Sequence, residues 1–442
     1  MHIRHPAAPR APRQGREHRR AERGSALLLS LMFSGILGFS LLAYLTLVSS
    51  QNLSVTRSQA WNHAMAMSEA GVEEALTQLA LSATNLAGNG WTLASGAYTK
   101  QRTMADGYYV VGISNVNPPV IYSQGYVLAP NSPAYLSPRT VRVTTQTTGL
   151  FASGLVAKGQ VALVGGVRTD SFDSTDPNYS TGGTYDPTKY KDNGDVGSDG
   201  NVVGTITENG GVTVYGHVRT GPNGTDTISG QAVVGSMEWV NEGNTGIQPG
   251  WSRSDMNMDF PDVTVPFTSG ATPANGTIGN TNYAVVIASG NYVMSALNLS
   301  SQQKMIVTGQ ASLYVSGDIS MSGQSFIYLV PGARLTLYCG GSASLTGNGV
   351  ANANLDALSF QYYGLPSNTS LALSGNAAFT GVIYAPEAAF SMNGGGNNTY
   401  DFVGAAVAST INMNGHFHFH YDESLGQRGP GAGYTLTSWN EI

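Results

Sequence analysis

The sequence predicts a mainly β protein that begins with one long α-helix, continues into a small antiparallel sheet and ends in a parallel β-solenoid. Three observations support this fold class: an uncharged apolar run near the N-terminus, short apolar pairs that recur in the second half, and an unusual composition. Glycine contributes 56 of 442 residues and charged residues only 11%, against about 7% and about 25% in average proteins. The alternative is a β-sandwich or jelly roll, which would favour strands of about five or six residues.

The first element is an apolar run from Ser25 to Val48, directly after a basic leader, residues 1–24. It would form a helix of about 36 Å, which is enough to cross a hydrocarbon core of about 30 Å. The leader carries seven arginines and two glutamates, so the positive-inside rule predicts one pass with the leader in the cytoplasm. A cleavable secretory signal would have a shorter apolar core, of about 7–15 residues. The predicted membrane-anchor residues are Ser25, Leu29, Phe33, Leu37, Leu41 and Val48.

The helix is predicted to continue to about residue 83 with one apolar face. Steps of three and four residues indicate such an amphipathic helix. The two halves would form one long rod, and an ordinary juxtamembrane helix that packs on the globular part is the alternative. The face consists of Trp61, Met65, Ser68, Val72, Leu76 and Leu79.

The start of this helix resembles the processing site of type IV prepilins and pseudopilins. Glu22-Arg23-Gly24 is followed by Ser25-Ala26-Leu27-Leu28-Leu29, and the string SEAGVEEA at 68–75 resembles the stretch that commonly follows such anchors. The resemblance is closest to PilX-type minor pilus-assembly proteins. It implies that a prepilin peptidase cuts between Gly24 and Ser25 and that the helix then associates with other pilin-like subunits. A plain uncleaved signal anchor is the alternative.

One departure from the pilin pattern affects the role that this resemblance implies. Leu29 stands at the fifth mature position, where major pilins carry a glutamate that pairs with the amino terminus of a neighbouring subunit. Without that pair, the resemblance implies a minor, tip or initiating component and not a bulk fibre subunit.

Residues 84–150 are predicted to form the small antiparallel β region. Strand-like runs lie at 107–113, 120–127 and 140–147, with proline- and asparagine-rich breakers between them. A small antiparallel sheet after a long helix is the plan of a pilin head.

Residues 151–425 are predicted to form the glycine-rich solenoid. Short apolar pairs suit the flat faces of a coil that buries its interior by stacking on the next coil. Residues 239–284 lack this pattern and are expected to form an irregular insertion, and 426–442 a C-terminal tail. The pairs include Leu313/Val315, Ile319/Met321, Ile327/Leu329 and Leu335/Leu337, then Leu371/Leu373, Ala377/Phe379, Ile411/Met413 and Phe417/Phe419.

This region resembles a domain of pilus-associated and bactofilin-like bacterial proteins. The resemblance lies in three strings: TDSFDS at 169–174, GVIYAPEA at 381–388 and HFHYDESL at 418–425. It implies a structural role and no reaction.

The strongest candidate for chemistry is the run His416, His418 and His420. Strand alternation places these imidazoles on the outer face, opposite Phe417 and Phe419. Neighbouring imidazoles about 7 Å apart could share a zinc ion, but the outer two are about 13 Å apart, so all three would not converge easily. The other interpretation is that this run is the solvent-exposed last strand of the solenoid. Its polar face would then discourage pairing with the edge strand of another molecule. We therefore expect no bound cofactor, and the three histidines remain the only metal-ligand candidates.

Other functional classes find little support. No nucleophile elbow, phosphate-binding loop or zinc-protease motif occurs, and 305–419 contains one arginine and no lysine, which argues against an enzyme. Without the leader the net charge is −11, which argues against nucleic acid as a partner. The carboxylates of 170–199 do not fit an EF-hand, because its twelfth position counted from Asp195 is Ile206. The one cysteine, Cys339, is expected in the core.

Five tyrosines could line a groove in which their rings stack on sugars or contact a protein partner. They could equally be half-buried residues on the faces of the solenoid. They are Tyr328, Tyr338, Tyr362, Tyr363 and Tyr384.

Together these features predict a non-enzymatic minor pilin-like protein of the inner membrane, with its body in the periplasm or on the cell surface or pilus. It would act as an assembly or adhesive component of a type IV pilus or type II secretion-like system. Its partners would be the membrane, other pilin-like subunits and a prepilin peptidase, with a surface glycan or protein as a further candidate. The rivals are a static bactofilin-like envelope scaffold and a membrane-tethered solenoid that binds or cleaves carbohydrate.

Overall fold

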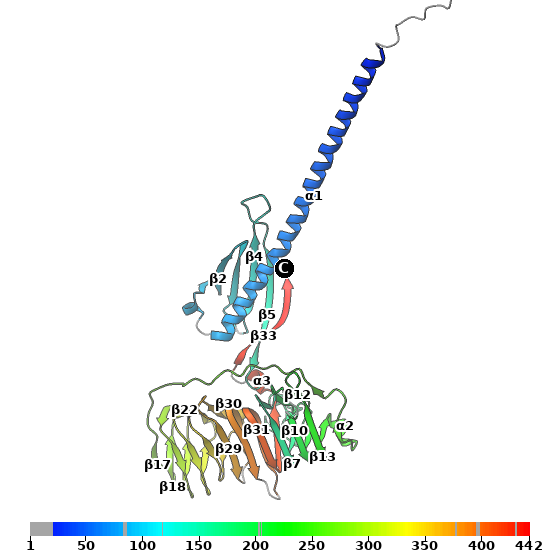
Figure 1. Ribbon diagram of the computed structural model, residues 1–442. Coiled ribbons are helices and arrows are strands. Elements are labelled where there is room, and N and C mark those ends of the chain that lie inside the picture. The colour runs from blue at the N-terminus through cyan, green and yellow to red at the C-terminus, as the bar shows by residue number, and fades with distance from the viewer. Residues whose placement is uncertain are drawn as a thin grey trace, which may run out of the picture. The chain divides into compact units, whose positions relative to one another are not determined.

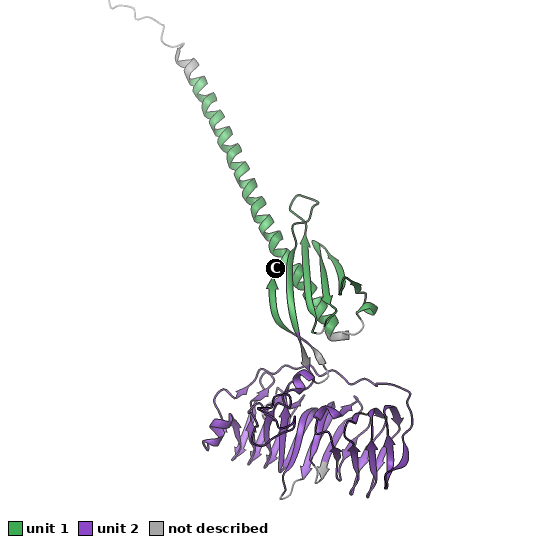
Figure 2. Ribbon diagram, turned by 180° about the vertical axis from the view of Figure 1, so that it is seen from behind, with its two compact units in different colours: residues 1–145, 436–442 green, residues 146–435 purple. Residues whose placement is uncertain are grey.

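The computed structural model describes residues 21–82, 86–116, 118–201, 204, 206–375, 378–394, 398–428 and 431–442. The chain forms two compact units, shown in Figure 2: unit 1 comprises residues up to 145 together with 436–442, and unit 2 comprises residues 146–435. The predicted fold class is confirmed: the chain is mainly β, with one long N-terminal helix, a small antiparallel sheet and a stack of parallel strands.

Unit 1 contains helix α1 (Ala21–Ser82), whose 62 residues extend about 93 Å. It is the one helix of the described chain that is long and apolar enough to cross a membrane. The most apolar window has a mean hydropathy of 2.2, and none of it is buried against the protein. Figure 1 shows that the N-terminal half of α1 extends beyond the sheet, and its apolar side chains are exposed.

The C-terminal half of α1 packs on a six-stranded antiparallel sheet, mainly on β3 and β4. Ser68, Val72 and Leu79 are buried as the amphipathic pattern predicts, whereas Trp61 is exposed and lies under the guanidinium of Arg139. In sheet order the strands are β1 (Thr92–Ala94), β2 (Ala97–Met104), β3 (Gly107–Ser114), β4 (Val120–Val127), β5 (Arg139–Gly149) and β33 (Gly431–Glu441).

The C-terminal segment corrects one prediction. Most of 426–442 is not a tail but strand β33, which pairs with β5 and completes the sheet. Arg139 donates two hydrogen bonds of 2.6 Å to the Glu441 carboxylate, and the hydroxyls of Thr144 and Thr437 are 2.9 Å apart. The residue order of these contacts makes β5 and β33 antiparallel neighbours.

Unit 2 is a parallel β-solenoid, so the sandwich alternative is wrong. Its ladders are parallel apart from β17 with β18 and a few isolated bridges. Successive coils align Gly290, Ala311, Leu335 and Phe360, which are 21, 24 and 25 residues apart. Each coil buries its apolar pair on the next, and the described members of the predicted pairs are buried; Ala377 lies outside the described residues.

The first stack of unit 2 consists of three coils and the short helix α2 (Met237–Asn241). Its strands are β6 (Leu155–Ala157), β7 (Val161–Gly165), β8 (Arg168–Phe172), β9 (Val196–Ser198), β10 (Ile206–Gly210), β11 (Thr213–Tyr215), β12 (Val218–Thr220), β13 (Asp226–Gly230), β14 (Val233–Gly235), β15 (Gly246–Ile247) and β16 (Ser252–Arg253).

The second stack begins with the β17–β18 pair and ends on two long strands. Its strands are β17 (Ala274–Ile278), β18 (Thr281–Ile287), β19 (Gly290–Met294), β20 (Leu297–Leu299), β21 (Lys304–Val307), β22 (Gln310–Val315), β23 (Ile319–Met321), β24 (Phe326–Leu329), β25 (Arg334–Cys339), β26 (Ala343–Leu345), β27 (Val350–Asn352), β28 (Phe360–Gly364), β29 (Ser370–Gly375), β30 (Phe379–Gly394) and β31 (Tyr400–Gly415). Strand β32 (Phe417–Asp422) and helix α3 (Leu425–Arg428) follow.

The two stacks meet at a junction in the middle of the solenoid. There β31 pairs with β6, β7 and β32, and β32 pairs with β8, so the last strands of the solenoid lie beside its first coil (Figure 1). One inward column of fully buried residues runs through both stacks: Leu313, Leu337, Tyr362, Ile383, Ala406, Leu155, Val196 and Val218. The solenoid thus has one continuous core.

The predicted irregular insertion is shorter than expected. Within 239–284, the longest run without strands or helices is 254–273, because the end of α2, β15, β16, β17 and part of β18 lie in the rest, with short turns between them. This segment, here called the strap, connects the β16 end of the first stack with the β17 end of the second. Met258, Phe260 and Val263 pack against the core, and the Tyr384 hydroxyl donates a 2.8 Å hydrogen bond to the Pro261 carbonyl.

Candidate functional site

A cluster of histidine and aspartate side chains lies on the outer face of the junction. In the register of β31, β32 and β8, Asp401, His418 and Arg168 form one row across the three strands. His420 and Asp170 lie in the row two residues further on. Neighbouring strands are about 4.8 Å apart and every second residue faces the same side, so these side chains meet. The inner face beneath them carries Phe402 and Phe419, whose ring centres are 4.8 Å apart.

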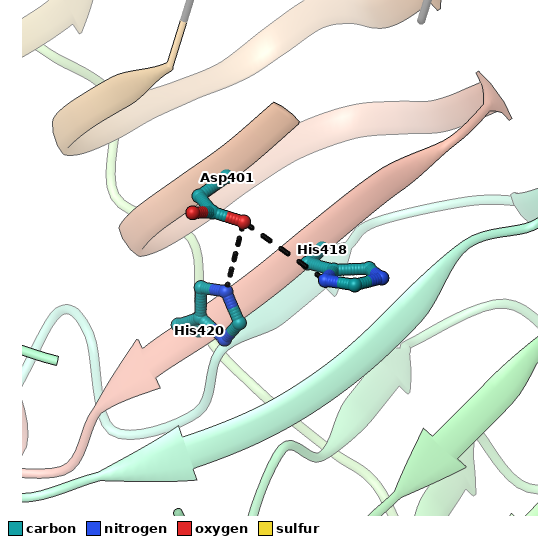
Figure 3. A group of neighbouring side chains, drawn as sticks. All are labelled: Asp401, His418 and His420. Atoms are coloured by element: carbon teal, nitrogen blue, oxygen red, sulfur yellow. Dashed lines mark hydrogen bonds and ion pairs between the residues drawn. The ribbon is translucent and has the colours of Figure 1, made fainter. Parts of the chain in front are cut away.

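Within this cluster, His420 is held between two carboxylates. Its Nδ1 lies 2.6 Å from Asp170 Oδ1, and its Nε2 lies 3.3 Å from Asp401 Oδ1. His418 Nδ1 lies 3.9 Å from the same Asp401 oxygen. Figure 3 shows both imidazoles directed toward the Asp401 carboxylate. One ligand atom from each of Asp401, His418 and His420 lies within 4.8 Å of the other two.

The buried side of the cluster is formed by the segment between β8 and β9. Tyr185 stacks on the His420 ring with a centroid distance of 3.6 Å and donates a 3.0 Å hydrogen bond to Asp170 Oδ2. Arg168 forms an ion pair with the same oxygen at 2.8 Å, and its guanidinium lies 4.3 Å from the Tyr190 ring. Asp170 and His420 are buried, whereas the side chains of Asp401 and His418 are 52% and 33% exposed. The cluster is therefore closed on the Asp170 side and open at Asp401.

The two histidines have opposite electrostatic environments. Burial disfavours charged His420, but its hydrogen bonds to Asp170 and Asp401 outweigh this effect and raise its pKa. Burial lowers the pKa of His418, and the nearby His420 adds to that effect. The hydrogen bond from His420 lowers the pKa of Asp401. Relative to an ordinary histidine, the charged form is thus favoured at His420 and the neutral form at His418.

The predicted metal-ligand candidates are only partly brought together. His418 and His420 share the outer face as expected, but His416 precedes β32, is exposed and is not part of the group. Asp401 and Asp170 were missed, because they lie 19 and 250 residues from His420 and are placed by strand register. The recurring apolar pairs are the signal that could have aligned the coils.

Three further carboxylates of 170–199 have structural roles in turns. Asp173, Asp176 and Asp186 each accept a hydrogen bond from the backbone N–H two residues later. Hydrogen bonds from Thr181 and Thr188 lower the pKa of Asp186 to about 2. These contacts stabilise the segment that carries Tyr185.

The five tyrosines do not share one groove. Tyr362 points into the core, where it bonds to Asn368, and Tyr328 lies on the separate sheet that contains β24. Tyr338, Tyr363 and Tyr384 form a ladder partly covered by the strap, and a cleft of about 310 Å³ remains between them and the Pro261–Pro266 part of the strap. Cys339 is buried in the core, as predicted.

The anchor residues all lie on α1. The side chains of Leu29, Phe33, Leu37 and Leu41 are exposed, and that of Val48 is half-buried. Gly24 and Ser25 belong to the first turns of α1, and the surroundings of the Ser25 side chain lie outside the described residues.

Comparison with known proteins gives one match. Residues 268–428 match the model of a family described as a domain of unknown function, DUF7305. The matched region contains the second stack, β31, β32 and α3, and therefore Asp401, His418 and His420, but not Asp170. No curated protein and no solved structure matches the chain. The second stack together with the closing strands is thus similar to this domain.

Proposed function

We propose that this chain is a membrane-inserted, non-enzymatic minor pilin-like protein that carries the β-solenoid outside the cytoplasmic membrane. It would serve as an assembly or adhesive component of a type IV pilus or type II secretion-like system. Its leader would lie in the cytoplasm, and its body would lie in the periplasm or on the cell surface or pilus.

The observation that carries this proposal is the division of α1 into two halves. The N-terminal half exposes Leu29, Phe33 and Leu37 by 55%, 59% and 68%. Exposed apolar surface of this extent favours lipid or other apolar helices as its environment. The C-terminal half packs on an antiparallel sheet, which is the arrangement expected of a pilin head. The prepilin-like residues around Gly24 support the same function.

The solenoid supports a structural role. Its interior is apolar and continuous, and the ladder of Tyr338, Tyr363 and Tyr384 is partly occupied by the strap. A carbohydrate site built from all five tyrosines is therefore less well supported than the assembly role. The static envelope scaffold remains the rival, because it needs the same anchor and the same stack of coils.

The test is the mass of the mature chain. The full-length protein is produced in a host that contains a prepilin peptidase and in an otherwise identical host without it, and the membrane-extracted protein is analysed by intact mass and N-terminal peptides. We expect a chain that begins at Ser25 only where the peptidase is present. Gly24→Val should block the cut, whereas Gly35→Val, a matched change within the same helix, should not.

Two outcomes would contradict the proposal. A chain that still begins at Met1 in the peptidase-containing host would favour the static scaffold. A freely soluble body, trimmed after Val48, would exclude both membrane-anchored alternatives.

A further inference from the structure

We propose that Asp401, His418 and His420 bind one divalent transition-metal ion, with Zn²⁺ as the expected ion, and that this ion fastens the junction between the two stacks. The proposal depends on side chains of unit 2 and not on processing or assembly of the anchor. The three ligand atoms already lie within 4.8 Å of one another.

The donor geometry fits a tetrahedral ion. Zinc binds imidazole nitrogen and carboxylate oxygen at about 2.0–2.2 Å, which places two donors of one tetrahedron about 3.3 Å apart. Asp401 Oδ1 and His420 Nε2 are separated by 3.3 Å, and Asp401 Oδ1 and His418 Nδ1 by 3.9 Å. His418 would need to move closer to both other ligands, since its Nδ1 is about 0.6 Å too far from Asp401 Oδ1 and the ligand atoms of the group lie up to 4.8 Å apart. Its ring is one-third exposed, which leaves it room to do so.

The surroundings of His420 are those of a metal ligand. Metal-bound histidines usually donate their second ring N–H to a carboxylate, which fixes the tautomer and the ring orientation. Asp170 Oδ1 accepts such a bond from His420 Nδ1 at 2.6 Å, which leaves Nε2 facing Asp401. Asp170 is in turn held by Arg168 and Tyr185, and Tyr185 also stacks on the imidazole. His420 is therefore oriented before any ion binds.

An ion-pair network without metal explains only part of the cluster. It accounts for His420, which bridges Asp170 and Asp401. It accounts less well for His418, whose only contact with Asp401 Oδ1 within the group is an ion pair of 3.9 Å, too long for a hydrogen bond. A metal ion gives all three side chains a common partner. The exposed side of Asp401 leaves room for a water molecule as the fourth ligand.

The ion would join segments that are far apart in the sequence. Asp401 lies on β31 and the two histidines on β32, and through Asp170 the site reaches β8 of the first coil. Because binding energy at such a site adds to folding energy, the ion would stabilise the contact between the closing strands and the first coil.

The test uses the full-length protein in detergent, treated with EDTA and then titrated with Zn²⁺ by calorimetry, with Co²⁺ as a visible-absorption probe. Asp401→Asn and His418→Gln should each lower the Zn²⁺ affinity at least tenfold, and Asp170→Asn about 10–100-fold. His416→Gln is the matched control, since His416 is an exposed histidine two residues from His418 and outside the group. It should leave the affinity unchanged. The leader histidines are present in every variant, so Zn²⁺ binding by them contributes equally and does not affect the comparison. These are His2, His5 and His18.

Stability gives the second measurement. Zn²⁺ should raise the unfolding temperature of the wild type and of His416→Gln but not of Asp401→Asn or His418→Gln, and circular dichroism without metal shows whether each variant folds. Both substitutions change partly exposed side chains, so at least one folded variant is expected. Equal Zn²⁺ affinity in all variants, an equal loss with His416→Gln, or no binding by the wild type would overturn the proposal.

Discussion

Glu208 is an ionisable residue in the interior of the solenoid. It lies on β10 and is fully buried, and neither carboxylate oxygen has a hydrogen-bond partner among the described residues. Burial, with a further contribution from the charge of Asp226, raises the pKa of Glu208 to about 8. The native protein therefore holds a proton here that the unfolded chain releases near the ordinary glutamate pKa of 4.5.

This residue predicts how stability depends on pH. Because the native state binds the extra proton, stability falls as the pH rises from about 4.5 through about 8, by up to about 5 kcal/mol. Glu208→Gln should remove most of this fall, so the variant should be more stable than the wild type at pH 8.5 and similar at pH 5. The measurement is the denaturant midpoint of the β circular dichroism signal at both pH values.

A surface glutamate provides the control for this prediction. Glu238 is exposed on α2, so Glu238→Gln should leave the pH dependence as in the wild type. If the stability of the wild type and of Glu208→Gln changed equally with pH, Glu208 would not be a buried carboxyl group without a hydrogen-bond partner.

Residue-scale prediction from the sequence succeeded where alternation alone decides the outcome. It placed Phe417 and Phe419 in the core and His418 and His420 on the opposite face. It could not find Asp401 or Asp170, because their positions depend on the register between coils and not on local spacing.

At the scale of elements, α1 and β4 approach so closely that a glycine is required between them. A Cβ atom on Gly125 would lie 2.1 Å from the Ala64 carbonyl oxygen of α1. That neighbour is backbone, so it cannot rotate away. The close contact buries Ala64 and Met67 against the sheet.

Gly125→Ala should therefore destabilise unit 1. Overpacking of a tight contact typically costs about 1–3 kcal/mol, and here the helix must shift away from β4. Thermal unfolding and limited proteolysis of the full-length protein measure the effect. The control is Gly112→Ala on β3, whose Cβ would have its nearest neighbour at an ordinary 3.6 Å. Equal stability of the two variants would contradict the close packing of α1.

The elements themselves were predictable to different degrees. The apolar pairs stepping by six and eight residues are successive faces of one coil, and the full coil is 21–25 residues long. The loops between strands differ in length, so the repeat of the coil is not constant in the sequence and could not be recognised there. Strands β2 and β33 were missed because they present many polar, exposed side chains, and their pairing partners set their conformation. Examples are Gln101, Arg102 and Thr103 in β2, and Thr437, Asn440 and Glu441 in β33.

At the scale of the whole molecule, the solenoid is inserted between two neighbouring strands of unit 1. The chain leaves unit 1 after Thr145 and returns at Leu436, and the flanking strands β5 and β33 pair with each other. An insertion of this kind leaves both units with complete sheets.

This arrangement predicts that unit 1 folds without the solenoid. Replacing residues 146–435 by an Asn-Gly turn should give a β5–β33 hairpin, with a helix and sheet that resist proteolysis as in the full chain. Loop length alone changes stability by only about 0.6 kcal/mol per doubling. Deleting 431–442 instead should weaken unit 1, because β5 then loses its partner and Arg139 loses Glu441. If unit 1 became sensitive to protease in the variant with the Asn-Gly turn, it would not fold independently of the solenoid.

The position of the junction has a mechanical consequence. The chain enters the solenoid at β6 and leaves it after β32, and both strands belong to the middle of the stack. Tension applied through β5 and β33 would reach the two central coils first, and neither outermost coil carries a chain end from which it could be peeled. Extension would have to shear several ladders together at the junction, among them the long ladder between β30 and β31 and the shorter ones that join β31 to β6 and β7. A solenoid connected in this way resists unzipping coil by coil.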